Sequence, residues 1–178
     1  MEKLHQDKSR FERKYLVNQH LAWKFRYVLN TKGFKIAYPK RKINSIYFDT
    51  YEYSFFKDNV EGVKNRIKPR IRWYENLDSS SKNINKMIFE IKKKEGFVGT
   101  KEFYDLNLKM NISEIYKKIN DYNFLKKISA IVGKNVFPIL QTSYLREYYL
   151  SRNDKFRSTI DTNLHVKNIR SQNNFKVP

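Results

Sequence analysis

The chain has 178 residues, a length typical of one domain and sufficient for a sizeable hydrophobic core. Lys and Arg number 37 against 18 Asp and Glu, and the formal net charge of +19 predicts an anionic partner: nucleic acid, a phosphorylated metabolite or an anionic membrane. The absence of Cys excludes disulfides, thiol nucleophiles and Cys-based zinc sites. No apolar run is of signal-peptide or membrane-spanning type, so we expect a cytoplasmic protein. No clear domain boundary is apparent, so we expect one domain over residues 1–178.

The first predicted elements are a strand and a helix. Residues 10–17, RFERKYLV, alternate imperfectly and end in β-formers, which favours a strand. Asn18 resembles a helix N-cap, and apolar residues recur at helical spacing from Gln19 to about Asn30, with Gly33 as a terminator. We expect the apolar stripe of this helix to belong to the core.

Strand patterns dominate the middle of the chain, beginning with INSIYFDT at 43–50. RIKPRIRWYE (66–75) and KMIFEIKKK (86–94) are predicted to form the two arms of a hairpin around the polar segment 76–85. Pro69 cannot donate a hydrogen bond to a sheet, so it predicts an edge, a bulge or a break at that position.

The rest of the chain combines helices with further strands. The predicted elements are, in order, a strand at 101–108, two helices between 112 and 132 divided near 120–123 and stopped by Gly133, strands at 138–151 and 155–164, and a polar tail over 165–178. At least six strands against two helical regions predict an α+β fold with an antiparallel, hairpin-rich sheet.

Cations occupy every second position of the predicted strand 66–75. Alternate side chains of a strand point to the same side, and the four that share one face here are Arg66, Lys68, Arg70 and Arg72. Neighbouring pairs lie about 7 Å apart and repel each other by roughly 2 kcal/mol at an effective dielectric constant of about 20. We expect an anion to relieve this repulsion.

Other predicted strands add to the same basic face. The further cations are Arg10, Lys14, Lys92, Lys101, Arg146 and Arg157, and the interleaved carboxylates are Glu12, Glu90 and Asp161. A single such charge is most often part of a solvated sheet face, but accumulation of one sign favours a binding face. Closing the sheet into a barrel would gather the cations around a lumen, where guanidinium groups bind phosphate oxygens. Carboxylates together with substrate phosphates are the ligands that Mg²⁺ or Mn²⁺ usually accepts in proteins. Each carboxylate could instead form a salt bridge with a neighbouring cation. We expect the salt bridge for Asp161.

Six segments resemble, in order, the pieces of a VTC domain, which is the polyphosphate-polymerase branch of the CYTH-like triphosphate-tunnel superfamily: FERKYLV, SIYFDT, RIRWYE, FEIKKK, SYLREYY and FRSTIDTNL. They span roughly positions 10–164. The resemblance implies an antiparallel β-barrel or tunnel in which basic side chains bind a triphosphate or polyphosphate chain, assisted by Mn²⁺ or Mg²⁺. It implies catalytic phosphate ligands at Lys14, Arg70, Arg72, Lys92 and Arg146, and further phosphate ligands at Lys101 and Arg157. The strand pattern itself adds Arg10, Arg66 and Lys68 as phosphate ligands and Glu12 and Glu90 as metal ligands.

The sequence departs from the superfamily pattern at both ends. The superfamily's hydrolases open with Glu-x-Glu-x-Lys, whereas Arg10, Glu12 and Lys14 occupy these positions here, which favours the polymerase branch. The family pattern continues beyond the strand of Asp161 with a strand that supplies a metal-binding Glu, but this sequence stops at Pro178. Either the chain is truncated or the tunnel is incomplete, and we expect this chain to bind tripolyphosphate better than it forms polyphosphate.

The function implied by the resemblance is transfer of the terminal phosphoryl group of ATP to a polyphosphate chain. A triphosphatase, in which water attacks in place of phosphate, remains an alternative. So does a non-catalytic module that binds polyphosphate or nucleic acid. Two observations argue against nucleic acid as the ligand. The charged residues recur at every second position, as in a strand, with carboxylates among them, and the sequence has no helix-turn-helix, RNP or zinc pattern.

Overall fold

The computed structural model describes residues 2–7, 12–76, 83–84, 87–96, 98–106, 110–170 and 174–176. In this part of the chain an eight-stranded antiparallel sheet has the order β1-β6-β5-β3-β2-β8-β9-β10. Its strands are β1 (Glu2–Asp7), β2 (Lys35–Asp49), β3 (Asn65–Asn76), β5 (Met87–Glu95), β6 (Val98–Asp105), β8 (Phe137–Leu150), β9 (Arg157–Asn168) and β10 (Asn174–Lys176). The short strands β4 (Asn83–Ile84) and β7 (Met110–Asn111) pair separately.

The helices are η1 (Gln19–Leu21), α1 (Ala22–Thr31), α2 (Ser54–Val60), α3 (Ile112–Ile119) and α4 (Tyr122–Val132). The predicted α+β class, the hairpin of β3 with β5 and the hairpin of β8 with β9 are confirmed. The division of the second helical region is also confirmed, because the side chain of Asp121 accepts a hydrogen bond from Phe124 N and starts α4. Gly133 ends α4 with a left-handed φ of 78°.

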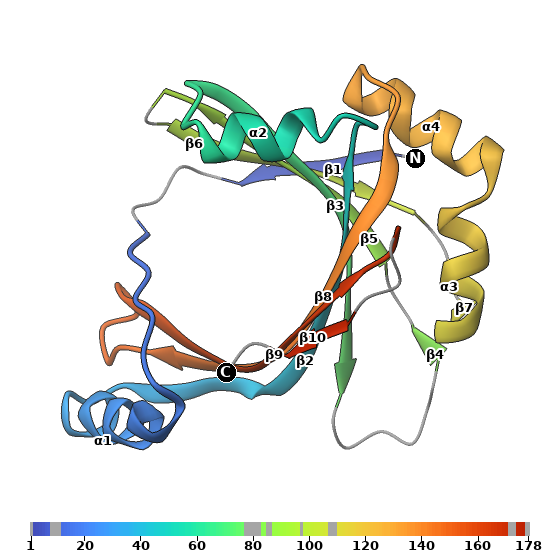
Figure 1. Cartoon of the computed structure of the whole chain (residues 1–178). Coiled ribbons are helices and arrows are strands. Elements are labelled where there is room, and N and C mark those ends of the chain that lie inside the picture. Colours follow the sequence, from blue (N-terminus) through green and yellow to red (C-terminus); the bar gives the residue numbers. More distant parts are fainter. Residues whose placement is uncertain are drawn as a thin grey trace.

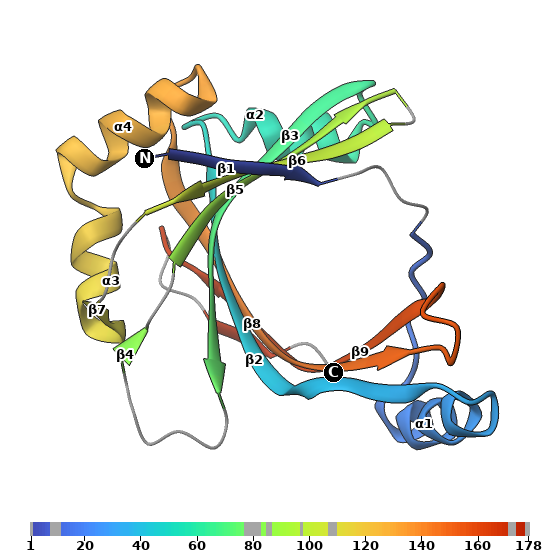
Figure 2. The same cartoon turned by 180° about the vertical axis from the view of Figure 1, so that it is seen from behind.

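The sheet curls strongly but does not close into a barrel (Figure 1, Figure 2). Its end strands are β1 and β10, which pair with β6 and β9 and not with each other. Register shifts interrupt the pairing of β2 with β8 near Tyr38 and Tyr47, and that of β8 with β9 between Ser143 and Leu145. Such irregularities bend a strand and increase its twist, so they explain how these long strands follow the curl.

The core lies on the outer face of the curl, beneath α3 and α4 (Figure 1). Alternate residues of β3 point outward, and Ile71 and Trp73 are 0% and 2% exposed. They belong to one cluster with Ile115 of α3 and Ile128 of α4. Burial of such side chains contributes about 1.5–3 kcal/mol each, so the outer face stabilises the fold and the inner face carries the remaining, mostly polar side chains of these strands.

Asp49, within the SIYFDT segment, has a structural task at the end of β2. Its buried carboxylate accepts hydrogen bonds from the backbone N–H groups of Thr50, Phe55 and Phe56, at 2.7–2.9 Å. Because these donors lie in the turn before α2 and in its first turn, Asp49 fixes the start of that helix.

Pro69 lies inside β3, in register with Ile91 of β5. The register of β3 with β2 ends at Arg70, opposite Tyr47. Pro69 therefore lies just beyond the β2 pairing, where its missing N–H group interrupts no contact with that strand. The expected local edge is present, although β3 as a whole is a central strand.

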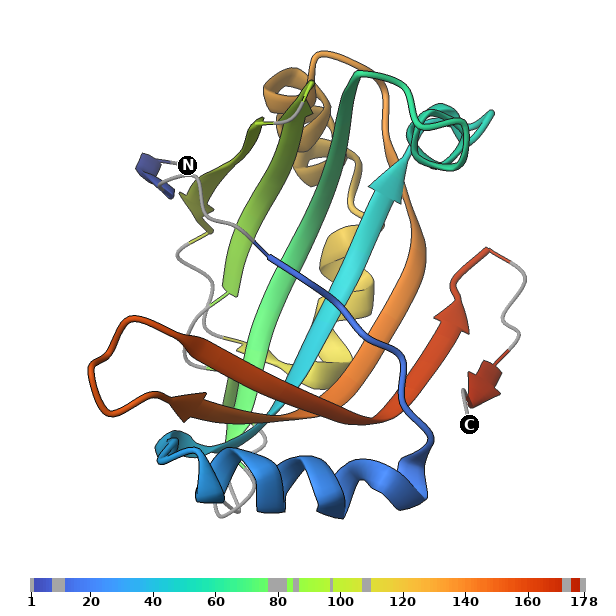
Figure 3. The same ribbon diagram turned by 90° about the vertical axis from the view of Figure 1, so that its left-hand side faces the viewer.

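The strand predicted at residues 10–17 is wrong over the part that the structure describes, because residues 12–18 have no regular secondary structure. A strand needs a neighbouring strand for its backbone hydrogen bonds, and β1, not this segment, pairs with β6. Residues 12–18 instead pass across the open side of the curl, between β1 and α1 (Figure 3).

The predicted helix is present as η1 and α1, but its apolar stripe is not core. None of the residues of α1 is buried, and Trp23 and Tyr27 are 60% and 66% exposed. The helix lies outside the limb that β2 and β8 form, away from the core cluster (Figure 1). Asn18 lies at the predicted position directly before η1, and its backbone oxygen accepts a hydrogen bond from Leu21 N at 2.9 Å.

No helix among the described residues is both long enough and apolar enough to span a membrane.

Candidate phosphate-binding site

The predicted basic face of β3 is the inner face of the curl, opposite the core. The pairing of β3 with β5 and of β5 with β6 places Lys68, Lys92 and Lys101 directly across from one another. Two residues further along β3, Arg70 is in register with Tyr47 of β2 on one side and with Glu90 of β5 on the other. The alternation in the sequence therefore becomes rows of polar side chains that cross several strands.

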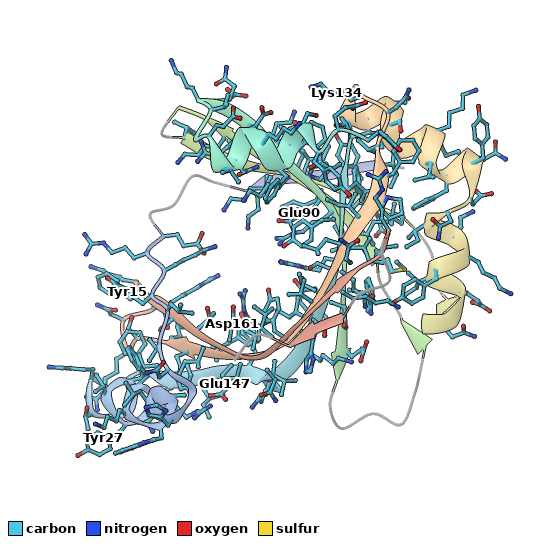
Figure 4. The ribbon with its side chains drawn as sticks, in the orientation of Figure 1. Tyr15, Tyr27, Glu90, Lys134, Glu147 and Asp161 are labelled. Atoms are coloured by element: carbon cyan, nitrogen blue, oxygen red, sulfur yellow. The ribbon has the colours of Figure 1, made fainter. Side chains whose placement is uncertain are left out.

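Glu90 binds the two central arginines of the inner face. Arg70 Nη2 donates to Glu90 Oε1 at 2.7 Å, and Arg72 Nη1 lies 3.7 Å from Glu90 Oε2. Glu90 is 2% exposed, and Figure 4 shows it pointing into the curl. Burial raises the pKa of Glu90, but Arg70, Arg72 and Lys101 together lower it by more, so the carboxylate stays ionised.

Arg70 is held from two sides. Its Nη1 donates to the hydroxyl oxygen of Tyr47 at 3.0 Å, and the guanidinium carbon lies 5.8 Å from the centre of that ring. Burial lowers the pKa of Arg70, but Tyr47 and Glu90 raise it above its ordinary value. The buried Nε has no hydrogen-bond partner in the described part of the chain. The guanidinium is thus fixed in place by two hydrogen bonds, one on each side.

The lysine row of Lys68, Lys92 and Lys101 concentrates positive charge beside this arginine pair. The pKa of Lys68 is lowered, first by partial burial and then by the like charges of Lys92, Lys14 and Arg66, although Tyr47 opposes the shift. Lys92 Nζ lies 3.8 Å from Glu12 Oε2. The charges of this row therefore repel one another, and an anion bound among them would relieve that repulsion.

Arg146 and Asp161 form a second charged group on the inner face. Arg146 Nε and Nη2 donate to the two carboxylate oxygens of Asp161, both at 2.6 Å. The predicted salt bridge of Asp161 is confirmed, with Arg146 as its partner and not Arg157. Asp161 lies on the lower limb in Figure 4, facing the region that Glu90 faces from above.

Tyr144 lies between the two charged groups. Burial raises its pKa, and the charges that act on it next come from Arg146, Arg72, Asp161 and Arg70. The guanidinium carbon of Arg146 is 5.2 Å from the centre of the Tyr144 ring. The sequence analysis missed this residue, although its position two residues before Arg146 would have placed it on the same strand face. Tyr47 could not be found this way, because its place depends on the pairing of β2 with β3.

The remaining predicted ligands are less central. Arg66 Nη1 donates to the backbone oxygen of Val63 at 2.7 Å, near the start of β3. Arg157 is exposed at the first residue of β9. Lys14 lies in the segment that crosses the open side and is near enough to act on Lys68. Arg10 lies outside the described residues.

The two predicted metal ligands do not fit a divalent cation in this arrangement. Both oxygens of Glu90 face guanidinium groups, and Glu12 is half exposed beside Lys92. No group of three or more His, Asp or Glu side chains that could hold a metal occurs in the described ranges. On the inner face the two central arginines are positioned by a carboxylate, Glu90, and not by a metal site.

One protein-family model matches nearly the whole chain. A family model described as the VTC domain matches residues 9–177. Comparison with curated proteins gives no match. Because the family model covers most of the chain, the chain belongs to the VTC domain family.

Proposed function

We propose that the inner face binds a nucleoside triphosphate and inorganic polyphosphate, and that the domain transfers the terminal phosphoryl group of ATP to the polyphosphate chain. Membership of the VTC family supports a polyphosphate-polymerase-like role within the tunnel superfamily. The observation that carries the proposal is the row of Lys68, Lys92 and Lys101 beside Arg70 and Arg72, in which cations outnumber carboxylates on one face.

The reaction needs little acid–base chemistry from the protein. A terminal phosphate oxygen of the polyphosphate chain bonds to the γ-phosphorus of ATP, the bond from that phosphorus to the bridging oxygen breaks, and ADP leaves. The attacking phosphate is already ionised, so positioning and charge neutralisation account for most of the catalysis.

The inner-face residues suit these two tasks. Glu90 and Tyr47 hold Arg70 in one orientation, which prepares a planar donor for phosphate oxygens. The lysine row places ammonium groups, carried on flexible side chains, along the neighbouring strands. Arg70 and Arg72 share one carboxylate, so they retain net positive charge for a ligand.

A non-catalytic polyphosphate-binding module is a second candidate. The ion pairs of Glu90 favour it, because a carboxylate that faces two guanidinium groups is poorly placed to bind a metal. Binding of phosphate chains is common to both candidates, and chain growth is specific to the first.

The decisive experiment is incubation of the protein with ATP and Mn²⁺, followed by measurement of both long-chain polyphosphate and free phosphate. We expect polyphosphate to form, slowly, and the thermal unfolding midpoint to rise from phosphate to pyrophosphate to tripolyphosphate at equal ligand concentration, because the longer ligands contact more cations and bind more tightly. Free phosphate without chain growth would indicate a triphosphatase. Ligand-dependent stabilisation without either product would indicate the binding module.

A matched pair of variants locates the binding. Lys68→Met removes a cation of the lysine row, whereas Lys57→Met removes an exposed cation of α2, outside that row. We expect only Lys68→Met to reduce the stabilisation by tripolyphosphate. Equal losses in both variants would mean that general charge, and not the inner face, binds the ligand.

A further inference from the structure

Aromatic side chains gather on the inner face beyond the arginines. Tyr38 of β2 is in register with Tyr148 of β8, and Arg41 of β2 is in register with Arg146. Tyr74 follows Arg72 by two residues on β3 and therefore points to the same side. We call Tyr38, Arg41, Tyr74 and Tyr148 the aromatic end of the inner face.

Two contacts join three of these side chains, and the fourth, Tyr74, lies near Tyr148. The rings of Tyr38 and Tyr148 meet edge to face, with centroids 5.7 Å apart and planes at 89°. The guanidinium carbon of Arg41 lies 5.8 Å from the centre of the Tyr38 ring. Tyr74 is close enough to act electrostatically on Tyr148.

The aromatic end does not contribute to the hydrophobic core. Tyr38 and Tyr74 are 52% and 40% exposed, and neither belongs to the core cluster on the outer face. Large aromatic surfaces that stay exposed on a concave face, with cations beside them, suit a planar ligand that stacks on the rings. Guanidinium groups such as that of Arg41 stack on the same kind of ligand.

The aromatic end lies at a suitable separation from the phosphate-binding cations. Two residues along a strand span about 7 Å, which is the step from Arg72 to Tyr74 on β3. A ligand whose phosphates contact Arg70 and Arg72 would therefore extend toward Tyr74 with the group that follows its phosphates. In a nucleoside triphosphate that group is the ribose with its base.

We propose that Tyr38, Tyr74 and Tyr148, with Arg41, form a stacking subsite for the base of a nucleoside triphosphate. This inference rests on the proposed function and adds the recognition of the nucleoside. Stacking tolerates different bases, because each base presents a π-face, but a larger ring system buries more area. The subsite therefore prefers purine to pyrimidine nucleotides and prefers either to tripolyphosphate.

The experiment compares dissociation constants for ATP, CTP and tripolyphosphate, measured by calorimetry at one ionic strength, in the wild type and in variants. We expect the wild type to bind ATP more tightly than CTP. Replacing Tyr74 and Tyr38 together by Ala is expected to weaken ATP binding about tenfold and to change tripolyphosphate binding by less than about twofold. Tyr74→Phe keeps the ring and should retain the wild-type preference for ATP.

The control variant is Tyr122→Ala, which removes an exposed tyrosine of α4 on the opposite side of the sheet. If the wild type binds ATP no more tightly than it binds tripolyphosphate, the base subsite is overturned while phosphate binding is left intact. Equal weakening of ATP and tripolyphosphate binding in a variant whose circular dichroism is unchanged would overturn the subsite too. Failure of the wild type to bind either ligand would instead overturn the proposed function as well.

Discussion

Glu90 makes the two central arginines of the inner face dependent on a single buried carboxylate. Its Oε1 accepts from Arg70 at 2.7 Å, and its Oε2 lies 3.7 Å from Arg72. The desolvation of charges at 2% exposure is costly, and it is offset only while the ion pair remains complete. Glu90 thus determines the orientation of the two guanidinium groups.

Glu90→Gln is expected to destabilise the protein by about 3–5 kcal/mol, because it leaves buried guanidinium charge without its partner. The measurement is the free energy of unfolding from urea titration at neutral pH. Glu95→Gln, at the exposed end of the same strand, is the control and should change stability by less than about 0.5 kcal/mol. A small effect of Glu90→Gln would show that water enters the site and solvates the arginines.

Alternation along β3 and β5 was enough to predict from the sequence that Arg70, Arg72 and Lys92 would share one face. The partners of these residues could not be predicted, because they come from other strands and depend on register. Glu90 is the clearest case: its charge and spacing suggested a metal ligand, and only the pairing of β5 with β3 placed it against two arginines. Tyr47 and Tyr144 entered the site for the same reason.

At the scale of elements, α1 is attached to the sheet chiefly through polar contacts. Arg26 donates to both carboxylate oxygens of Glu147 in β8, at 2.8 and 2.9 Å. Lys40 Nζ lies 3.2 Å from Glu147 Oε1, and the Tyr149 hydroxyl donates to Glu147 Oε2 at 2.9 Å. Figure 4 shows Glu147 on the side of the lower limb that faces α1. This attachment replaces the apolar packing that the sequence predicted for the helix.

The attachment of α1 is expected to weaken in acid. The hydrogen bond from Arg26 is the main cause that holds the pKa of Glu147 at about 2, below its ordinary value of 4.5. A group with a depressed pKa in the folded state stabilises the protein above the unfolded value and loses that contribution as pH falls. The Glu147 contribution should therefore be complete above about pH 5 and decline from there toward pH 2.

The measurement is the difference in unfolding free energy between the wild type and Glu147→Gln at several pH values. We expect the wild type to be more stable at pH 6 and the difference to shrink by pH 3. Glu61→Gln, at the exposed end of α2, should give a small difference at every pH. A constant deficit for Glu147→Gln would mean that its side chain contributes packing and not charge.

The elements with local signals were predicted best. Gly133, Asp121 and the alternating strands each reveal their structure within a few residues. The strand prediction for residues 10–17 failed because alternation within a segment does not show which strand it pairs with, and β1 is the strand that pairs with β6. The prediction that the apolar stripe of α1 belongs to the core failed for another reason. Amphipathic spacing predicts that a helix has one apolar face, but it does not predict whether another element covers that face.

At the scale of the molecule, the net charge of +19 allows binding to many polyanions, and we expect the shape of the curled sheet to discriminate between them. The cations of the inner face lie along a curved surface with the core on its far side (Figure 1). A thin, flexible phosphate chain can follow such a surface. Duplex DNA has a persistence length of about 50 nm and presents its phosphates on a stiff rod, so it would contact mainly the outer cations.

We expect the two polyanions to bind at different places and to respond differently to mutation. Lys68→Met should weaken binding of a polyphosphate of about 20 phosphates several-fold, because it removes a cation of the inner face, and should leave duplex DNA binding nearly unchanged. Raising the salt from about 50 to 200 mM should weaken the non-specific DNA complex by orders of magnitude, since its affinity depends on counterion release. The measurement is fluorescence anisotropy of labelled polyphosphate and of a labelled duplex, with Lys57→Met as the control for loss of one charge. If Lys68→Met weakens both complexes equally, the inner face does not distinguish phosphate chains from nucleic acid, and the curl of the sheet contributes nothing to specificity.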